Sequence, residues 1–313
     1  MNALLFPGQG SQVVGMGSEF YNNFDIVKKI FRQADEKLNF SISKMILEGP
    51  EDHLQLTKNT QPAILIVSYS IFTVLKKEFG FDFNSFKYFA GHSLGEYSAL
   101  VCAEALSLND ALYLLHERGK AMQAAVPPGK GSMLAVLGLN VKEVNNLIQN
   151  RKSKNGICEI ANDNAEGQVI ISGDKDSIQS FQDSLKQNKI KSIPLKVSAP
   201  FHCSLMKPAA ESMGDKIKAT KFNDPLFTII NNVTAKAEKN VSIIKTLLID
   251  QIFSTVKWRE SLINMSNKNI TNFIEIGPGK ALTGMVKRTI NNANSFSINS
   301  IADIKKFIDE FKK

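Results

Sequence analysis

The segment FAGHSLGEYSAL, residues 89–100, constrains the fold more than any other part of this sequence. A short apolar run leads into Gly91-His-Ser93-Leu-Gly95, and a helical pattern of apolar and polar residues follows. Two glycines around a serine, between a strand and a helix, are typical of a nucleophile elbow, a sharp turn that exposes the serine hydroxyl at the edge of a sheet. Bare matches also occur in ordinary glycine-rich turns, so the flanking strand and helix carry the prediction. The segment predicts an α/β fold with Ser93 as a candidate nucleophile.

A serine hydroxyl is a weak nucleophile that needs a base, and the sequence offers four histidines. His202 is the best candidate, because it follows a predicted strand in KVSAPFHCSLMKPA. His92 adjoins the serine and His116 lies within a predicted helix, so neither spacing favours the base. His53 lies in the polar segment GPEDHLQLT, where a solvated side chain is expected. The order of residues therefore favours His202 without deciding it.

Backbone N–H groups near the elbow are candidates for binding an oxyanion. The N–H of Leu94 follows the serine and points to where an oxyanion would form. The loop GQGSQVVGMG (8–17) has Val13 where a dinucleotide-binding loop has glycine, and GPGK (277–280) lacks the spacing of a phosphate-binding loop. A loop that leaves the first strand beside the elbow instead makes the N–H of Gln12 a candidate for the second donor; the alternative is a plain strand-to-helix turn.

One arginine falls on the apolar face of a predicted helix. In the segment 107–125, Ala111, Leu115, Arg118 and Met122 share one helical face. An arginine in such a place is usually ion-paired or extends its charged end to solvent. The alternative is an anion site, since a guanidinium can hold a carboxylate with two parallel hydrogen bonds. An acyl group that carries a free carboxylate would need this contact, whereas an acetyl group would gain nothing from it.

The order of predicted elements indicates an insertion. Helical patterns dominate up to PPGKG (127–131), which is typical of a domain boundary. The next segment, roughly 65 residues long, reads strand, helix, strand, strand, helix, strand, which is the ferredoxin-like arrangement. Strand patterns resume in FTIINNV (227–233) and NFIEIG (272–277). We therefore predict a large α/β domain with a parallel sheet from residues 1–127 and 197–313, and an inserted ferredoxin-like subdomain from residues 128–196.

Charge and cysteine content exclude several classes of function. The net charge of +8 favours anionic partners, but no basic block interleaved with aromatics indicates nucleic acid. Three cysteines without C-x-x-C spacing favour a reduced protein over a disulfide scaffold or a zinc site.

The longest apolar run, residues 63–75, is short for a membrane span and contains four polar or hydroxyl-bearing residues, so we expect a buried helix. The first residues do not resemble a signal or transit peptide, so we expect a cytoplasmic protein without a membrane anchor.

Several motifs together resemble the malonyl-CoA:acyl carrier protein transacylases of fatty acid synthesis, and the resemblance covers nearly the whole chain. Ordered motifs at a family's spacing are far more specific than any single one. The motifs are FPGQGSQ, TQPAIL, GHSLGEYSAL, RGKAM, ANDNAEGQVIISG, VSAPFHCSLMKPA and IEIGPGKALTGMVKR.

The resemblance implies a hydrolase-like α/β domain with an inserted ferredoxin-like subdomain, and it implies a role for each candidate residue. Ser93 would carry the malonyl group, and His202 would act as general base and acid. The N–H groups of Gln12 and Leu94 would stabilise the oxyanion, and Arg118 would bind the malonyl carboxylate. Malonyl-CoA and an acyl carrier protein would be the substrates of a monomeric enzyme that needs no metal or redox cofactor.

The resemblance also concerns the surroundings of His202. Members of the family orient this histidine through a main-chain carbonyl, and Gln251 matches that place. Asn162 and His92 are candidates for lining the cleft, although a turn-stabilising role suits Asn162 equally well. The residue before the histidine is often small in the bacterial enzymes, whereas here it is Phe201. This difference leaves open the size of the pocket and the strictness of malonyl selectivity.

Three other functions remain open from the sequence. A serine thioesterase or esterase would use the same elbow with water as acceptor, but would have no evident use for a buried arginine. A non-enzymatic thioester-binding module would not need both serine and histidine. A stand-alone acyltransferase of a polyketide synthase would have the same chemistry and a different carrier protein.

Overall fold

The computed structural model describes residues 1–151 and 155–311. Its larger sheet has the strand order β10-β9-β1-β2-β7-β8, in which the first five strands are parallel and β8 runs antiparallel to β7. The parallel strands confirm the predicted α/β class. The strands are β1 (Asn2–Phe6), β2 (Phe86–Gly91), β7 (Thr228–Ile230), β8 (Ala237–Glu238), β9 (Asn272–Ile276) and β10 (Asn294–Ile298).

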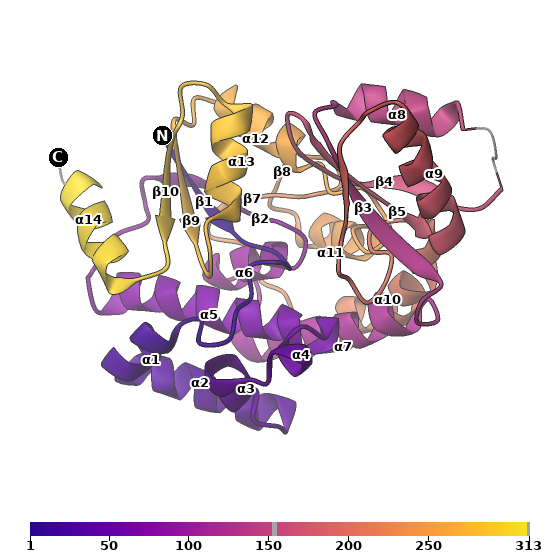
Figure 1. Ribbon diagram of the computed structural model, residues 1–313. Coiled ribbons are helices and arrows are strands. Elements are labelled where there is room, and N and C mark those ends of the chain that lie inside the picture. The colour runs from indigo at the N-terminus through magenta and orange to yellow at the C-terminus, as the bar shows by residue number, and fades with distance from the viewer. Residues whose placement is uncertain (152–154, 312–313) are drawn as a thin grey trace.

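The second sheet is antiparallel, with the order β4-β5-β3-β6, and α8 and α9 pack against it (Figure 1). The predicted order of strands and helices in this part of the chain is confirmed. The predicted limits of the subdomain, residues 128 and 196, stay a prediction. The elements are β3 (Gly131–Leu137), α8 (Val141–Gln149), β4 (Cys158–Ala165), β5 (Gln168–Asp174), α9 (Lys175–Gln187) and β6 (Ser192–Pro194).

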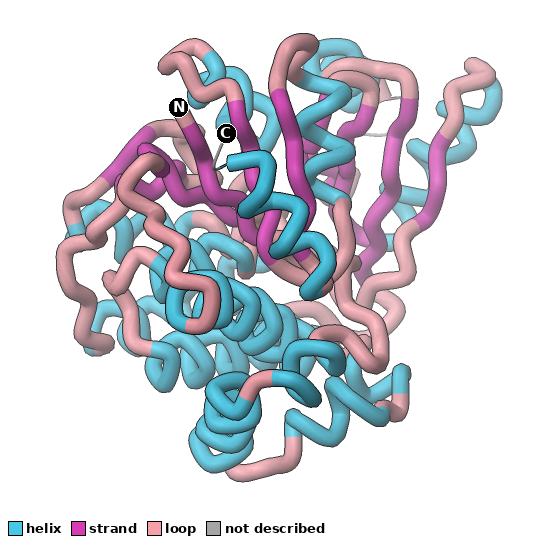
Figure 2. The backbone as a smooth tube through the Cα atoms, turned by 90° about the vertical axis from the view of Figure 1, so that its left-hand side faces the viewer, coloured by secondary structure: helices cyan, strands magenta, loops and turns pink. Residues whose placement is uncertain are grey.

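Helices cover both faces of the larger sheet. Figures 1 and 2 both show a layer of helices below the strands, and the labels of Figure 1 identify α5 in this layer with α1 to α4 beneath it. The other helices are α1 (Ser18–Asn23), α2 (Asp25–Leu38), α3 (Ile42–Glu48), α4 (Glu51–Leu54), α5 (Thr57–Lys77), α6 (Gly95–Cys102), α7 (Leu108–Ala124), α10 (Lys207–Ala219), α11 (Val241–Asp250), α12 (Trp258–Ser266), α13 (Ala281–Thr289) and α14 (Ile301–Phe311), with a short 3₁₀ turn η1 (Ser204–Met206).

The core explains the long apolar run in the sequence. Helix α5 is buried along most of its length and packs against α2, α6 and α7. A helix that is apolar on nearly all sides belongs in the interior of a large domain. In the two described ranges, no helix combines the length and hydrophobicity that crossing a membrane requires.

Main-chain hydrogen bonds join the smaller sheet to the loop after α11. Val256 N donates to Ala161 O over 2.8 Å, and Asp163 N donates to Val256 O over 3.0 Å. These bonds form a parallel bridge between Asn162 of β4 and Val256 in the loop after α11. The edge of the smaller sheet is therefore held against the larger domain.

The strand predictions missed the sheet edges. The last predicted strand of the subdomain is short: β6 covers only Ser192–Pro194, although Leu195 N still donates to Met133 O of β3 over 3.0 Å. Strands β8 and β10 are absent from the expected set. Both lie at an edge of the larger sheet, and the alternating pattern of β10, NSFSI, is short, with Phe296 and Ile298 as its apolar residues.

Candidate active site

The elbow forms where β2 ends and α6 begins. Ser93 has a φ of 53°, in the left-handed region that a serine rarely adopts. A Cβ built at Gly91 would lie 1.9 Å from Gly95 backbone atoms, and one at Gly95 would lie 2.3 Å from Phe6 O. Neither position can therefore carry a side chain. Asn232, just after β7, holds the turn: its Oδ1 accepts from Ser93 N (2.7 Å) and its Nδ2 donates to Gly91 O (2.8 Å).

His202 is the histidine that the fold brings to the serine. Its Nε2 lies 2.8 Å from Ser93 Oγ, and its Nδ1 lies 2.8 Å from Gln251 O. A carbonyl oxygen can only accept, so Nδ1 carries the proton and Nε2 is free to accept from the serine hydroxyl. Burial, together with the positive charge of Arg118, lowers the pKa of His202 to about 3. The imidazole is therefore neutral near pH 7 and able to act as a base.

The other three histidines have different surroundings. His53 is exposed on α4. His116 Nδ1 lies 2.9 Å from Lys58 O. His92 Nε2 lies 2.8 Å from Asn164 Oδ1, and its ring packs against Trp258. In the described part of the chain, His202 alone among the histidines is within hydrogen-bond distance of Ser93.

Arg118 lies inside the protein, only 1% exposed, on the face of α7 that the sequence pattern indicated. Its Nη2 is 3.1 Å from Ser93 Oγ and 2.9 Å from Gln251 Oε1, while its Nη1 donates to Gln61 Oε1 over 2.7 Å. Among residues 1–151 and 155–311, no carboxylate is within 4.0 Å of the guanidinium, and Nε has no hydrogen-bond partner. Neutral amides thus hold a buried cation beside the candidate nucleophile, and burial lowers its pKa.

A second layer of polar side chains supports these groups. Gln251, 1% exposed at the end of α11, donates from Nε2 to Ser93 O (3.1 Å) and Glu96 Oε2 (2.7 Å). Glu96 Oε2 also accepts from Asn232 N over 3.1 Å. The sequence prediction concerned only the main-chain carbonyl of Gln251. The side chains of Gln251, Glu96 and Asn232 were missed, because each lies in a separate element with no motif that links them.

A cavity of about 110 Å³ opens in front of Ser93. Leu94 and the predicted cleft residues Asn162 and His92 are among its lining residues, whereas Gln12 is not; Gln9, at the start of the same loop, takes that place. Its full lining is Gln9, Gln61, His92, Ser93, Leu94, Arg118, Met122, Met133, Asn162, Leu195, Val197, Phe201 and His202. Among the described residues, the N–H groups of Gln9 and Leu94 donate to no protein acceptor.

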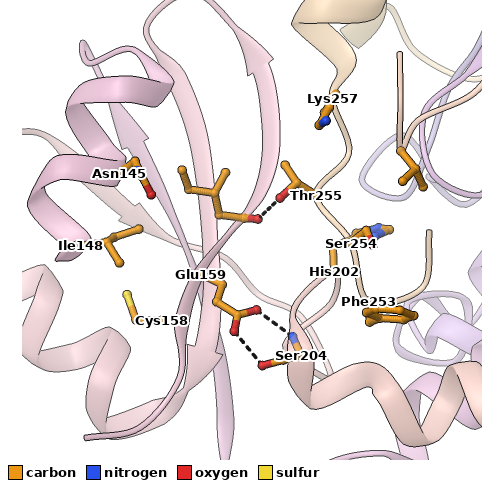
Figure 3. Close-up of a pocket in the computed structure, with 12 residues that line it drawn as sticks. Asn145, Ile148, Cys158, Glu159, His202, Ser204, Phe253, Ser254, Thr255 and Lys257 are labelled. Atoms are coloured by element: carbon orange, nitrogen blue, oxygen red, sulfur yellow. Dashed lines mark hydrogen bonds between the residues drawn. The ribbon is translucent and has the colours of Figure 1, made fainter. Parts of the chain in front are cut away.

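A larger pocket of about 610 Å³ adjoins His202 between β4, α8 and the loop after α11 (Figure 3). In Figure 3 the Glu159 carboxylate accepts from the N–H and the hydroxyl of Ser204, over 2.8 and 2.7 Å. Thr255 Oγ1 donates to Ile160 O over 2.6 Å. The bonds of Ser204 connect the smaller sheet to the segment that carries His202, and that of Thr255 connects it to the loop after α11.

Phe201 is buried and lines the smaller cavity next to His202. The side chain that differs from the common bacterial pattern therefore borders the space in front of the serine. In the described part of the chain, no three His, Cys, Asp or Glu side chains are grouped closely enough to hold a metal ion.

The sequence matches the family model of an acyl transferase domain over residues 3–311. It is 40% identical to the malonyl CoA-acyl carrier protein transacylase of Bacillus subtilis, over 99% of this chain and 97% of that protein. The Escherichia coli protein of the same name is 37% identical over 95% of each chain.

Solved structures agree with this. The acyl-carrier-protein-S-malonyltransferase of Bartonella henselae superposes with a TM-score of 0.96 at 37% identity, covering 100% of this chain and 99% of that one. A malonyl-transacylase in complex with its type II PKS acyl-carrier protein gives 0.94 at 35% identity, covering 99% of both. The chain belongs to the acyl transferase domain family, and within it to the malonyl-CoA:acyl carrier protein transacylases.

Proposed function

We propose that this enzyme transfers a malonyl group from malonyl-CoA to the phosphopantetheine thiol of an acyl carrier protein, through an acyl-enzyme on Ser93. The observation that carries the proposal is the buried Arg118, which lies 3.1 Å from Ser93 Oγ with no carboxylate partner among the described residues. A buried charge is unfavourable until it is paired. A malonyl group supplies the missing carboxylate, whereas an acetyl group does not.

In the first half-reaction, Ser93 Oγ attacks the thioester carbonyl of malonyl-CoA while His202 Nε2 takes the hydroxyl proton. The carbonyl oxygen becomes an oxyanion. When the C–S bond breaks, His202 returns the proton to the thiolate, so coenzyme A leaves as the thiol. The main-chain carbonyl of Gln251 stabilises the imidazolium that exists between these two steps.

Two N–H groups are proposed as donors to the oxyanion. Leu94 N–H follows the serine at the start of α6, and Gln9 N–H comes from the loop after β1. We propose Gln9 in place of Gln12, because Gln9 lines the cavity and Gln12 does not. Each such donor commonly contributes about 3–4 kcal/mol to transition-state binding.

In the second half-reaction, the carrier thiol gives its proton to His202 and attacks the Ser93 ester. The ester C–O bond breaks, and His202 returns the proton to Ser93. No metal or redox group enters either step. The net charge of +8 suits both the phosphates of coenzyme A and an acidic carrier protein.

The fatty acid carrier protein is the acceptor that we propose. The relatives from Bacillus subtilis and Escherichia coli, which are named for an acyl carrier protein, support this choice. The relative that binds a type II PKS carrier makes a polyketide carrier the alternative acceptor.

The test mixes the protein with malonyl-CoA or acetyl-CoA, quenches in acid and measures the intact mass. We expect one malonyl adduct on the wild type and none on Ser93→Ala. Adding fatty acid carrier protein or a polyketide carrier protein should then discharge the adduct, faster with the first. Equal labelling by acetyl-CoA would contradict the malonyl assignment, and release of free malonate without carrier would indicate a hydrolase.

A further inference from the structure

Glu96 is a buried carboxyl group that the proposed steps do not use. It lies three residues after Ser93 in the first turn of α6 and is 1% exposed. In the described part of the chain, no Lys, Arg or His nitrogen lies within 4.0 Å of its carboxylate. Burial raises the pKa of Glu96 to about 7. Burying a carboxyl group costs stability, so its position next to the proposed nucleophile indicates that it has a role in the site.

The side-chain amide of Gln251 connects Glu96 to Arg118. Gln251 Nε2 donates to Glu96 Oε2 over 2.7 Å, and Gln251 Oε1 accepts from Arg118 Nη2 over 2.9 Å. An amide has one donating and one accepting end, while a carboxylate only accepts and a guanidinium only donates. If the amide were rotated by 180°, its NH₂ group would face the N–H groups of Arg118 and its oxygen would face the carboxylate of Glu96, and neither pair could form a hydrogen bond. Glu96 Oε2 makes the shortest hydrogen bond of the Gln251 NH₂ group, which also donates to Ser93 O, so Glu96 favours this orientation of the amide, and the amide orients Arg118.

Unlike a direct ion pair between Glu96 and Arg118, this arrangement leaves N–H groups of Arg118 available to a substrate. A carboxylate in contact with Arg118 would occupy the N–H groups that a substrate carboxylate needs. With the carboxylate one amide away, Arg118 Nε keeps no partner among the described residues and Nη2 faces Ser93. When Glu96 is ionised, its negative charge also favours the buried guanidinium.

We propose that Glu96 is a positioning residue that acts through Gln251 to hold Arg118 in the orientation that receives the substrate carboxylate. The proposal deepens the proposed function and rests on it, because it assumes that the acyl group carries a carboxylate. Its expected consequence is a loss of preference for malonyl over acetyl, rather than a general loss of acylation.

The main test is Glu96→Gln, which keeps the size of the side chain but can present either an oxygen or an NH₂ group to Gln251. We expect the ratio of malonyl to acetyl loading rates, measured by quenched-flow and intact mass, to fall about 3- to 10-fold, as is typical when a charged hydrogen bond becomes a neutral one. Glu275→Gln is the matched control. Glu275 is fully buried in β9 and accepts hydrogen bonds from Leu282 N and Thr283 N, neither of which contacts Arg118. The Glu275→Gln variant should therefore keep the wild-type ratio of malonyl to acetyl loading.

A double-mutant cycle tests whether Glu96 acts through Gln251. Gln251→Leu removes the amide but keeps the main-chain carbonyl that His202 uses. We expect Glu96→Leu with Gln251→Leu to lower the ratio no further than Gln251→Leu alone, since the first change acts only through the second residue. Additive losses would overturn the proposal.

The remaining outcomes separate the two proposals. A wild type that prefers malonyl, with a Glu96→Gln variant of unchanged ratio, overturns the role of Glu96 and leaves the proposed function standing. An equal loss of malonyl and acetyl loading in Glu96→Gln also overturns it, because this is what a merely structural residue would give. A wild type that loads both groups alike overturns the proposed function and the role of Glu96 together.

Discussion

Two arginines of this protein have opposite kinds of partner. Arg259, where α12 meets the smaller sheet, donates from Nε to both carboxylate oxygens of Asp163, over 3.0 and 3.1 Å. Arg118, beside Ser93, makes its hydrogen bonds to amide and hydroxyl oxygens, and its guanidinium lies 5.9 Å from the centroid of the Tyr97 ring. Arg259 has its carboxylate partner within the protein, whereas Arg118 has none among the described residues. If the proposed role of Arg118 is right, the kind of partner distinguishes an arginine that joins two parts of a fold from one that binds a substrate.

The largest expected effect comes from removing the positive charge of Arg118. Arg118→Ala should lower the rate of malonyl loading by about 10²–10⁴-fold, the equivalent of the 3–5 kcal/mol that loss of one partner of a buried charge pair costs. Acetyl loading should fall far less, because acetyl has no carboxylate to lose. Quenched-flow with intact mass measures both rates. Arg259→Ala is the control and should keep the wild-type ratio; an Arg118→Ala variant that still prefers malonyl would remove the distinction between the two arginines.

Breaking the other pair should affect stability instead of selectivity. We expect Asp163→Ala to lower the free energy of unfolding by about 1–2 kcal/mol, since the pair is only partly exposed and its loss leaves Arg259 without its carboxylate. Burial raises the pKa of Asp163 despite the pair, so the net contribution of the pair to stability is small. Urea unfolding gives the value. Lys28→Ala, which removes an exposed pair with Asp25, should leave the midpoint unchanged; an equal loss in both variants would contradict this account.

The smallest expected effect concerns pH. The pKa of His202 is lowered to about 3, so the imidazole is neutral and competent well below its ordinary pKa. The rate at which an uncharged fluorophosphonate labels Ser93 should change less than about twofold between about pH 5.5 and 8. With a histidine of ordinary pKa near 6.5 as the base, the labelling rate would be about tenfold lower at pH 5.5 than at pH 8.

The same pH profile of Ser93 labelling, measured in variants of the two arginines, tests whether Arg118 influences the base. The charge of Arg118 is the second cause of the lowered pKa, after burial. In Arg118→Ala the pKa of His202 should therefore rise and the labelling rate should fall more at low pH, whereas Arg259→Ala should keep the wild-type profile. Identical profiles for the two variants would mean that Arg118 does not influence the base.

Sequence patterns predicted the parts of the site that local rules govern. The two glycines of the elbow are required by close backbone approach, and the helical spacing on α7 put Arg118 on the buried face. The main-chain contact between His202 and Gln251 came from the resemblance to a family rather than from any pattern in the residues.

The rest depends on contacts between distant segments. Glu96 reads as an ordinary acidic residue in the first turn of a helix, where the helix dipole favours it. Only the fold brings Gln251, 155 residues further on, within hydrogen-bond distance. Gln9 and Gln12 share one irregular loop without periodicity, so the sequence could not show which of them lines the cavity.

The left-handed backbone at both reacting residues has a consequence for how such a protein can evolve. Ser93 has a φ of 53° and His202 a φ of 58°, and a side chain in this region costs about 1–2 kcal/mol. Glycine would relieve both positions, so selection for stability alone would remove the nucleophile and the base. We therefore expect random mutation screened only for thermal tolerance to favour glycine at both positions, and so to abolish the proposed chemistry.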